Sequence, residues 1–227
     1  MRLLLAAALV AVARAGAAFS GAQVVSTEAD GARSVYGVDA DGDGDVDIFC
    51  AASLADWIAW YENDGSQLFA WRGIAEIEAP RDVRALDVDG DADVDLLSAY
   101  YSQVAWYEND GSQSFTERII TTLADSTFSV FAIDVDVDGD VDALSASYID
   151  DRVAWYENDG SESFTERVIT NSADGARSVF AIDVDGDGEA VLHLPARRRL
   201  DLRRVRDARA ERRGPVISSS FVVFKKL

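Results

Sequence analysis

The chain has 227 residues, 48% of them hydrophobic, so it is long enough for one domain or a small repeat array and too apolar for a disordered chain. The net charge is −20, and residues 191–227 alone carry +8 (eleven Lys/Arg against three Asp/Glu), which leaves −28 for the rest. A body this acidic is a poor partner for nucleic acids or anionic membranes and a good partner for cations.

Residues 1–17 have the pattern of a secretory signal peptide. Arg2 is a minimal basic region, an apolar run follows from Leu3 to Ala13, and small residues up to Ala17 offer a cleavage site. The run is shorter than the ~20 residues that span a bilayer, and no other stretch could cross one. We therefore expect a secreted, extracellular protein with no membrane span; an ordinary N-terminal helix is the alternative reading.

Residues 18–190 form a tandem repeat with a period of about 48 residues. The hexapeptide WYENDG occurs at 60–65, 106–111 and 155–160, and runs of alternating aspartates begin at Asp39, Asp87, Asp134 and Asp183. Each unit divides into four runs rich in β-branched and aromatic residues, which predict strands. In the third unit these runs cover 129–134, 142–148, 152–157 and 163–170. The Asn-Asp-Gly of each WYENDG predicts a hairpin turn.

Four strands in each tandem unit predict an all-β fold, a β-propeller-type array of four-stranded antiparallel blades. Residues 22–27 align with the last strand of a unit, and the fourth unit stops after its first strand and loop. We expect about three full blades plus partial blades at each end, an incomplete or truncated propeller. Alanines alternate with aromatic residues, so the sheets should be buried on both faces, and the repeated Trp155-Tyr156 pair should pack between blades rather than bind a ligand.

The aspartate runs join the first and second predicted strands of each unit and have the spacing D-x-D-x-D-G-x-x-D. Oxygen ligands at alternate positions, around a glycine that permits a sharp turn, are what Ca²⁺ requires. A bound cation would also offset the mutual repulsion of the carboxylates. The predicted ligands are the aspartates at positions 1, 3, 5 and 9, with position 7 (Asp140 in the third loop) offering its backbone carbonyl. These aspartates are Asp39, Asp41, Asp43 and Asp47 in the first loop; Asp87, Asp89, Asp91 and Asp95 in the second; Asp134, Asp136, Asp138 and Asp142 in the third; and Asp183, Asp185 and Asp187 in the fourth.

The four loops are not equivalent. The first and third are complete, whereas the second has Ala92 in place of glycine, which predicts a strained turn and weaker binding. The fourth has Val191 at position 9, so its binding of metal is left open. An EF-hand is excluded because position 12 is never Glu and the flanking segments are strands. Mg²⁺ fits less well because it prefers water ligands and strict octahedra.

With these loops and the in-register WYENDG turns, residues 22 to about 190 resemble FG-GAP/VCBS-type repeats, such as those of integrin α-subunit propellers. The Phe-Gly and Gly-Ala-Pro signatures are absent, so the similarity is to the calcium-loop half of the motif. The resemblance implies an extracellular calcium-stabilised propeller used in adhesion or ligand binding. It does not by itself exclude an accessory domain of an enzyme.

Residues 191–227 share nothing with the repeats. The Arg-rich run starts where the Asp-Val-Asp pattern of the repeats should continue. Because Asp-Val codons read in a shifted frame encode arginine, a gene-model artefact would produce such a run. A genuine basic arm that binds polyanions is the alternative. Only residues 219–227 of this divergent tail look capable of forming a strand that would help to complete the last blade.

Few residues suit catalysis. The only histidine is His193 in the tail, which removes Ser-His-Asp, Cys-His and histidine-zinc sites from the repeats. Cys50 has no basic neighbour to activate it, so we expect a packed thiol. A two-carboxylate glycosidase is compatible with the composition, yet the acids recur in every unit, whereas a catalytic pair usually breaks repeat symmetry. The features that do not repeat are few: Trp57, Trp71 and the Arg81-Asp82 segment.

We therefore predict a non-catalytic calcium-binding module for an extracellular protein or glycan ligand. The alternative is an accessory propeller fragment of an extracellular carbohydrate-active hydrolase or lyase. Either could be part of a larger propeller or multidomain protein.

Overall fold

The computed structural model describes residues 23–66, 68–183, 190–193, 216–218 and 221–223, which form strands and no helix. Three four-stranded antiparallel sheets follow one another along the chain, each with its strands in sequence order. The first blade contains β1 (Ala32–Val38), β2 (Asp47–Ala52), β3 (Trp57–Asn63) and β4 (Phe69–Glu76). The second contains β5 (Pro80–Leu86), β6 (Asp95–Tyr100), β7 (Gln103–Asn109) and β8 (Phe115–Thr121). The third contains β9 (Thr127–Ile133), β10 (Asp142–Ser147), β11 (Arg152–Asn158) and β12 (Phe164–Thr170).

A fourth, smaller sheet contains β13 (Phe180–Asp183), β14 (Ala190–His193), β15 (Val216–Ser218) and β16 (Phe221–Val223). Its strand order is β13-β14-β16-β15, which differs from that of the three blades. The fourth unit therefore continues beyond its first strand and loop, contrary to the prediction. β14 spans the predicted boundary between repeats and tail, and β16 lies inside the 219–227 segment that was expected to supply a strand.

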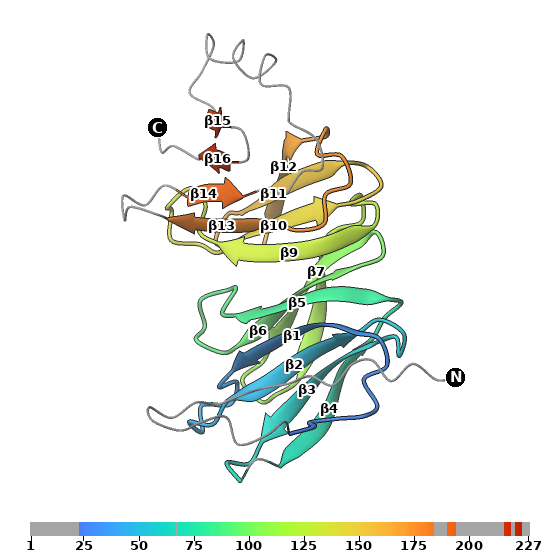
Figure 1. Ribbon diagram of the computed structural model, residues 1–227. Helices are drawn as coiled ribbons and strands as arrows, with labels where there is room; N and C mark the ends of the chain where they lie inside the picture. The colour runs from blue at the N-terminus through green and yellow to red at the C-terminus, as the bar shows by residue number, and fades with distance from the viewer. Residues whose placement is uncertain (1–22, 67, 184–189, 194–215, 219–220, 224–227) are drawn as a thin grey trace, which may run out of the picture.

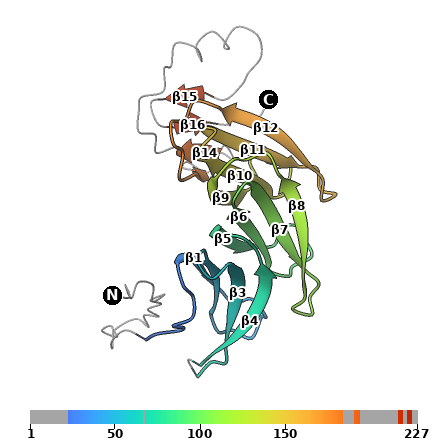
Figure 2. The same cartoon turned by 90° about the vertical axis from the view of Figure 1, so that its right-hand side faces the viewer.

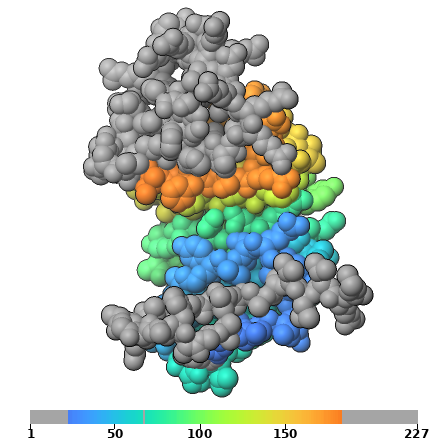
Figure 3. All heavy atoms as spheres, viewed as in Figure 1, coloured from blue at the N-terminus to red at the C-terminus, as the bar shows by residue number. Residues whose placement is uncertain are grey.

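The first and fourth sheets lie at opposite ends of the molecule (Figures 1 and 2), so the described strands form an open array rather than a closed ring. This confirms the prediction of an incomplete propeller. One detail of that prediction is wrong: residues 23–27 form no strand, so the described chain has no partial blade at its N-terminal end. Successive blades are stacked layers in the space-filling view (Figure 3). No helix suited to crossing a bilayer occurs among the residues that the structure describes.

The first strands of the blades lie side by side, β5 between β1 and β9 (Figure 1), and the last strands lie along the opposite edge (Figure 2). Side chains link the inner strands across the blades. Asp82 on β5 accepts hydrogen bonds from the Ser34 hydroxyl at 2.7 Å and from the Val130 backbone N–H at 3.1 Å. In the third blade Ser129 takes the position of Asp82, and its hydroxyl oxygen lies 3.5 Å from the Val179 backbone nitrogen, ahead of the fourth sheet.

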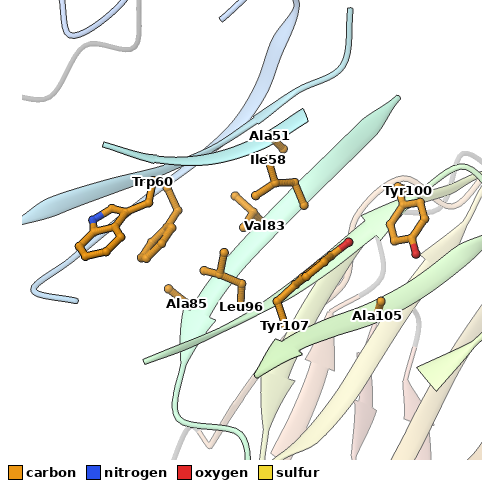
Figure 4. Packing of buried hydrophobic residues seen from close by; sticks show 10 residues of the cluster. Ala51, Ile58, Trp60, Val83, Ala85, Leu96, Tyr100, Ala105 and Tyr107 are labelled. Atoms are coloured by element: carbon orange, nitrogen blue, oxygen red, sulfur yellow. The ribbon is translucent and has the colours of Figure 1, made fainter. Parts of the chain in front are cut away.

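The core lies between the blades. The second strands β2, β6 and β10 are buried along their whole length, as expected for sheets covered on both faces. Between the first two blades, Phe49 and Trp60 pack against Val83, Leu96 and Tyr107 (Figure 4). The next layer repeats this arrangement with Trp106 against Val130 and Tyr156. The prediction is confirmed for the Trp155-Tyr156 pair, because Tyr156 packs with residues of the second blade and Trp155 packs with residues of the fourth unit such as Val179. Tyr61 differs, because it packs with Val25 in a cluster that contains no residue of the second blade.

Trp106→Ala should lower the free energy of unfolding by about 3–5 kcal/mol, because it removes a buried aromatic side chain and leaves a cavity between two blades. Trp71→Ala is the matched control, since Trp71 is 57% exposed on β4, and it should cost no more than about 1 kcal/mol. Urea unfolding followed by tryptophan fluorescence measures both, and equal losses would contradict the blade-to-blade packing.

Candidate metal centres

Each of the three aspartate loops that the structure describes joins the first strand of a blade to the second, as predicted, and begins with the same backbone arrangement. The first aspartate accepts hydrogen bonds from two backbone N–H groups of its own loop. Asp39 accepts them from Gly42 at 2.9 Å and Gly44 at 3.0 Å. The equivalent donors are Gly90 and Ala92 to Asp87 in the second loop, and Val137 and Gly139 to Asp134 in the third. The loop is therefore wrapped around its position-1 carboxylate.

The aspartate at position 9 is buried at the start of the second strand. Asp47, Asp95 and Asp142 are each no more than 1% exposed. In the third blade one carboxylate oxygen accepts the Val135 N–H and the other the Asn158 N–H, both at 2.8 Å. The first and second blades make the same pair of hydrogen bonds. This carboxylate joins the start of the loop to the end of the third strand.

Burial raises the pKa of all three position-9 carboxyls, although the two backbone N–H donors oppose the rise. The pKa of Asp95 and that of Asp142 reach about 7. Burial also raises the pKa of Asp41, Asp89 and Asp136 at position 3, with neighbouring aspartates adding to the rise. Negative charge in these loops is thus incompletely compensated by the protein.

Each of the three loops brings three carboxylates together, with oxygen atoms within 4.8 Å of one another. In the first loop they are Asp39, Asp41 and Asp43, so Asp47 is the predicted ligand left outside the group. In the second and third loops they are the aspartates at positions 1, 3 and 9, and Asp91 and Asp138 are left outside. The predicted fourth loop cannot be compared: Asp185 and Asp187 lie outside the described residues, and of Asp183 only the backbone is described.

These residues fit a hard divalent cation such as Ca²⁺, which binds carboxylate oxygens in flexible geometry. In the third loop Asp136 Oδ1 is buried and has no hydrogen-bond donor within reach. A buried carboxylate oxygen without a partner is costly, and a cation beside Asp134 and Asp142 would satisfy it.

The asparagine of WYENDG has a role that sequence reasoning missed. Besides forming the hairpin turn, Asn158 donates its backbone N–H to Asp142 and its side-chain amide to the Val141 carbonyl. Asn63 and Asn109 make the same two hydrogen bonds in their blades. The hairpin thus holds position 9 of the metal loop. The occurrence of WYENDG after each of the first three aspartate loops was the available signal.

The aspartate at position 7 also contacts this hairpin. A Cβ atom added to Gly65, Gly111 or Gly160 would lie 2.4–2.6 Å from a carboxylate oxygen of Asp45, Asp93 or Asp140, respectively. The three glycines also have positive φ. The positive φ favours glycine, and any larger residue would also displace the position-7 side chain.

A further acidic group joins two blades. Carboxylate oxygens of Asp89, Glu108 and Glu162 lie within 4.8 Å of one another, and Glu162 belongs to the third blade. Arg118 lies against both glutamates, at 2.5 Å from Glu108 and 4.0 Å from Glu162, and so compensates part of this charge.

Cys50 is buried and free, and burial raises its pKa to about 11, as expected for a packed thiol rather than a nucleophile.

A family model described as FG-GAP-like repeat matches residues 39–98, 87–145 and 134–192. Each match starts at the first aspartate of one loop and runs through the next loop, and together they cover more than half of the chain. The chain belongs to the FG-GAP-like repeat family. No curated protein matches the sequence.

Among solved structures, the FG-GAP-like chain is similar to an Agrocybe aegerita lectin that recognises non-reducing terminal N-acetylglucosamine. The TM-score is 0.52 at 18% identity, over 70% of this chain and 46% of the lectin. A weaker likeness is to the exo-β-1,3-galactanase of Phanerochaete chrysosporium, with a TM-score of 0.46 at 10% identity over 73% of this chain and 43% of that one. The chain thus spans about half the length of either structure, and the lectin likeness supports the fold.

Two loops hold a side chain where glycine fits better. The loops have positive φ at positions 4 and 6, which are Gly42 and Gly44 in the first loop. The second has Ala92 at position 6 with φ 76°, which agrees with the predicted strain, and the third has Val137 at position 4 with φ 63°. A β-branched residue is rarely found in this region.

Val137→Gly should raise the free energy of unfolding by about 1 kcal/mol, because relief of the left-handed strain exceeds the entropy that glycine adds to the unfolded chain. Val141 lies in the same loop but does not have positive φ, so Val141→Gly should lower the free energy of unfolding. Urea unfolding of the two variants checks the difference in sign, and a loss of stability in Val137→Gly would contradict it.

The raised pKa values of Asp95 and Asp142 predict proton release on calcium binding. Because both folded-state values exceed the unfolded one, their contribution to stability without metal is present at low pH and lost as pH rises through about 7. Near pH 6 calcium binding would release these protons, because the ion binds the ionised carboxylates. Near pH 8.5 both carboxyls are already ionised, so no proton would be released. Calorimetry in buffers of different ionisation enthalpy should show buffer-dependent heats only at pH 6; buffer-independent heats there would contradict it.

Proposed function

We propose that this FG-GAP-like repeat protein is a secreted, non-catalytic calcium-binding propeller module that binds an extracellular ligand or mediates adhesion. The observation that carries the calcium part is the recurrence, in all three described loops, of three carboxylates with oxygens within 4.8 Å. A chance acidic surface does not repeat in register, and the partnerless oxygen of Asp136 marks a place for a cation.

Bound calcium would supply positive charge where the protein buries acid. Asp134, Asp136 and Asp142 would hold the ion in the third loop, and the hydrogen bonds from Val135 and Asn158 keep Asp142 in place for it. Because the loops join the first and second strands, the ion would stabilise the folded blade and would have little affinity for the unfolded chain. Secretion fits this role, because extracellular modules commonly bind calcium at high concentration.

A binding role is favoured over catalysis by the surface chemistry of the repeats. The carboxylate groups that recur in every described blade belong to the aspartate loops, and the free thiol is buried. The lectin with a similar fold shows that this architecture can present a saccharide site, which supports ligand binding without naming the ligand.

Calcium should raise the melting temperature of the metal-free protein in a concentration-dependent way. Each occupied site should add about 2.7 kcal/mol to the free energy of unfolding when the calcium concentration is a hundred times Kd. Magnesium should have a smaller effect. Asp136→Asn should bind one calcium ion fewer per chain, because it removes a position-3 ligand of the third loop.

Glu76→Gln is the matched control, because it removes one negative charge from an exposed residue of β4, outside the loops, and should keep the full stoichiometry. Thermal unfolding with and without EGTA, together with isothermal titration, measures both effects. A melting temperature that is the same in calcium and EGTA would refute the calcium-binding part of the proposal.

A further inference from the structure

Three arginines from three repeat units occupy the same position at the start of the inner strands. Arg33 and Arg81 are the second residues of β1 and β5, and Arg177 has the same place in the fourth unit, ahead of β13. The third unit has Phe128 there instead. Arg81 and Phe128 are each followed by a buried residue that links the first strands of neighbouring units, Asp82 and Ser129 respectively. We call Arg33, Arg81 and Arg177 the arginine cluster.

Two members of the arginine cluster, Arg81 and Arg177, lie against aromatic rings. The guanidinium carbon of Arg81 lies 4.0 Å from the Phe128 ring centroid, and that of Arg177 lies 5.0 Å from it. Arg177 also lies 4.5 Å from the centroid of Tyr148, whose ring is 5.5 Å from that of Phe128. Arg81 donates a hydrogen bond from Nη1 to the Ser126 hydroxyl at 3.0 Å. Two positive charges therefore lie close to one ring.

The third arginine is near enough to act on the same group. Burial is the main cause that lowers the pKa of Arg81, and the positive charges of Arg33 and Arg177 lower it further. Like charges brought this close oppose one another unless an anion lies among them. Arg33 and Arg177 are exposed and can reach such an anion.

These arginines differ from every other arginine that the structure describes. The described ranges contain eight arginines and no lysine. The five outside the cluster each form an ion pair with an acidic side chain; they are Arg72, Arg84, Arg118, Arg152 and Arg167. No ion pair joins Arg33, Arg81 or Arg177 to an acidic residue within the described chain. In so acidic a protein, three cations without acidic partners in one place suit an anion from outside.

The arginine cluster is separate from the calcium loops. The inner strand runs from Arg33 to Val38 before the loop begins at Asp39, so the two sites lie about 20 Å apart at opposite ends of the strand. A ligand at the cluster therefore does not need to contact a loop ion.

We propose that the arginine cluster binds an acidic saccharide, with the guanidiniums holding a carboxylate or sulfate and the rings of Phe128 and Tyr148 contacting the sugar. Guanidinium forks match planar oxyanions with two parallel hydrogen bonds. Aromatic side chains beside a few charged groups are typical of small-ligand sites, which suits a short acidic saccharide. This inference rests on the proposed function as a binding module and names its class of ligand.

Titration calorimetry with the full chain in low-salt calcium buffer tests the proposal. The probes are trigalacturonate, its methyl ester, a sulfated galactose trisaccharide and a triglutamate peptide. Trigalacturonate or the sulfated sugar should bind, and their relative affinities tell a carboxylate from a sulfate site. The uncharged methyl ester and the peptide should bind at least tenfold more weakly.

The double variant Arg33→Gln/Arg177→Gln should weaken saccharide binding at least tenfold, and Arg81→Gln should have a similar effect. Arg72→Gln is the matched control, because Arg72 also lies over an aromatic ring, that of Trp60, but is paired with Glu62. It should change the affinity less than twofold. Equal binding by the cluster variants, equal binding of the methyl ester, or no binding of either acidic sugar overturns the proposal; tight binding of triglutamate overturns the saccharide assignment.

Calcium-dependent melting of the same variants separates this inference from the calcium part of the proposed function. Arg33→Gln/Arg177→Gln should keep the full calcium stabilisation, which also shows that it is folded. If calcium stabilises the protein and no acidic sugar binds, only the saccharide site is refuted. If an acidic sugar binds through the cluster and calcium has no effect, only the calcium proposal is refuted.

Discussion

The described blades depend on one buried carboxylate each, at position 9 of the aspartate loop. Asp47, Asp95 and Asp142 begin the second strand, accept one N–H from the loop and one from the end of the third strand, and are shielded from water. Two hydrogen bonds offset only part of the cost of burying a charge. The blade is consequently built around a buried acid whose charge the protein compensates only in part, which makes electrostatics part of its folding rather than a property of its surface.

Much of the fold could be predicted because each unit repeats the same local signals. Runs of β-branched and aromatic residues located all four strands of the third blade to within about two residues, and the buried alternation of alanine with aromatic residues indicated stacked sheets. The ends could not be predicted in this way. Residues 23–27 have strand-forming side chains but form no strand in the described chain, and the order β13-β14-β16-β15 depends on long-range pairing with a tail unrelated to the repeats.

The candidate site was predicted as a set of residues rather than as an arrangement. The spacing of the aspartates in the sequence identified them as candidate ligands, because the alternation of side-chain oxygens along a loop depends only on the local sequence. It did not show that Asp43 would join the first group while Asp47 would not, because this depends on small differences in loop conformation. Nor could it show that Val137 has positive φ, because only position 6 of the loop, where glycine was expected, was known to turn sharply. The roles of Asn158 and Glu162 arise from contacts between separate hairpins, which no single motif contains.

The contact of the position-7 aspartate with the hairpin glycine has a consequence for how such repeats diverge. Asp140 and Gly160 belong to different motifs, yet a Cβ atom at Gly160 would lie 2.6 Å from a carboxylate oxygen of Asp140, so the Asp140 side chain would have to move. A larger residue in the turn would therefore displace the side chain at position 7 of the loop, so a change in one motif alters the surroundings of the other. Substitutions in the turn and in the loop of one blade should therefore be selected together rather than independently.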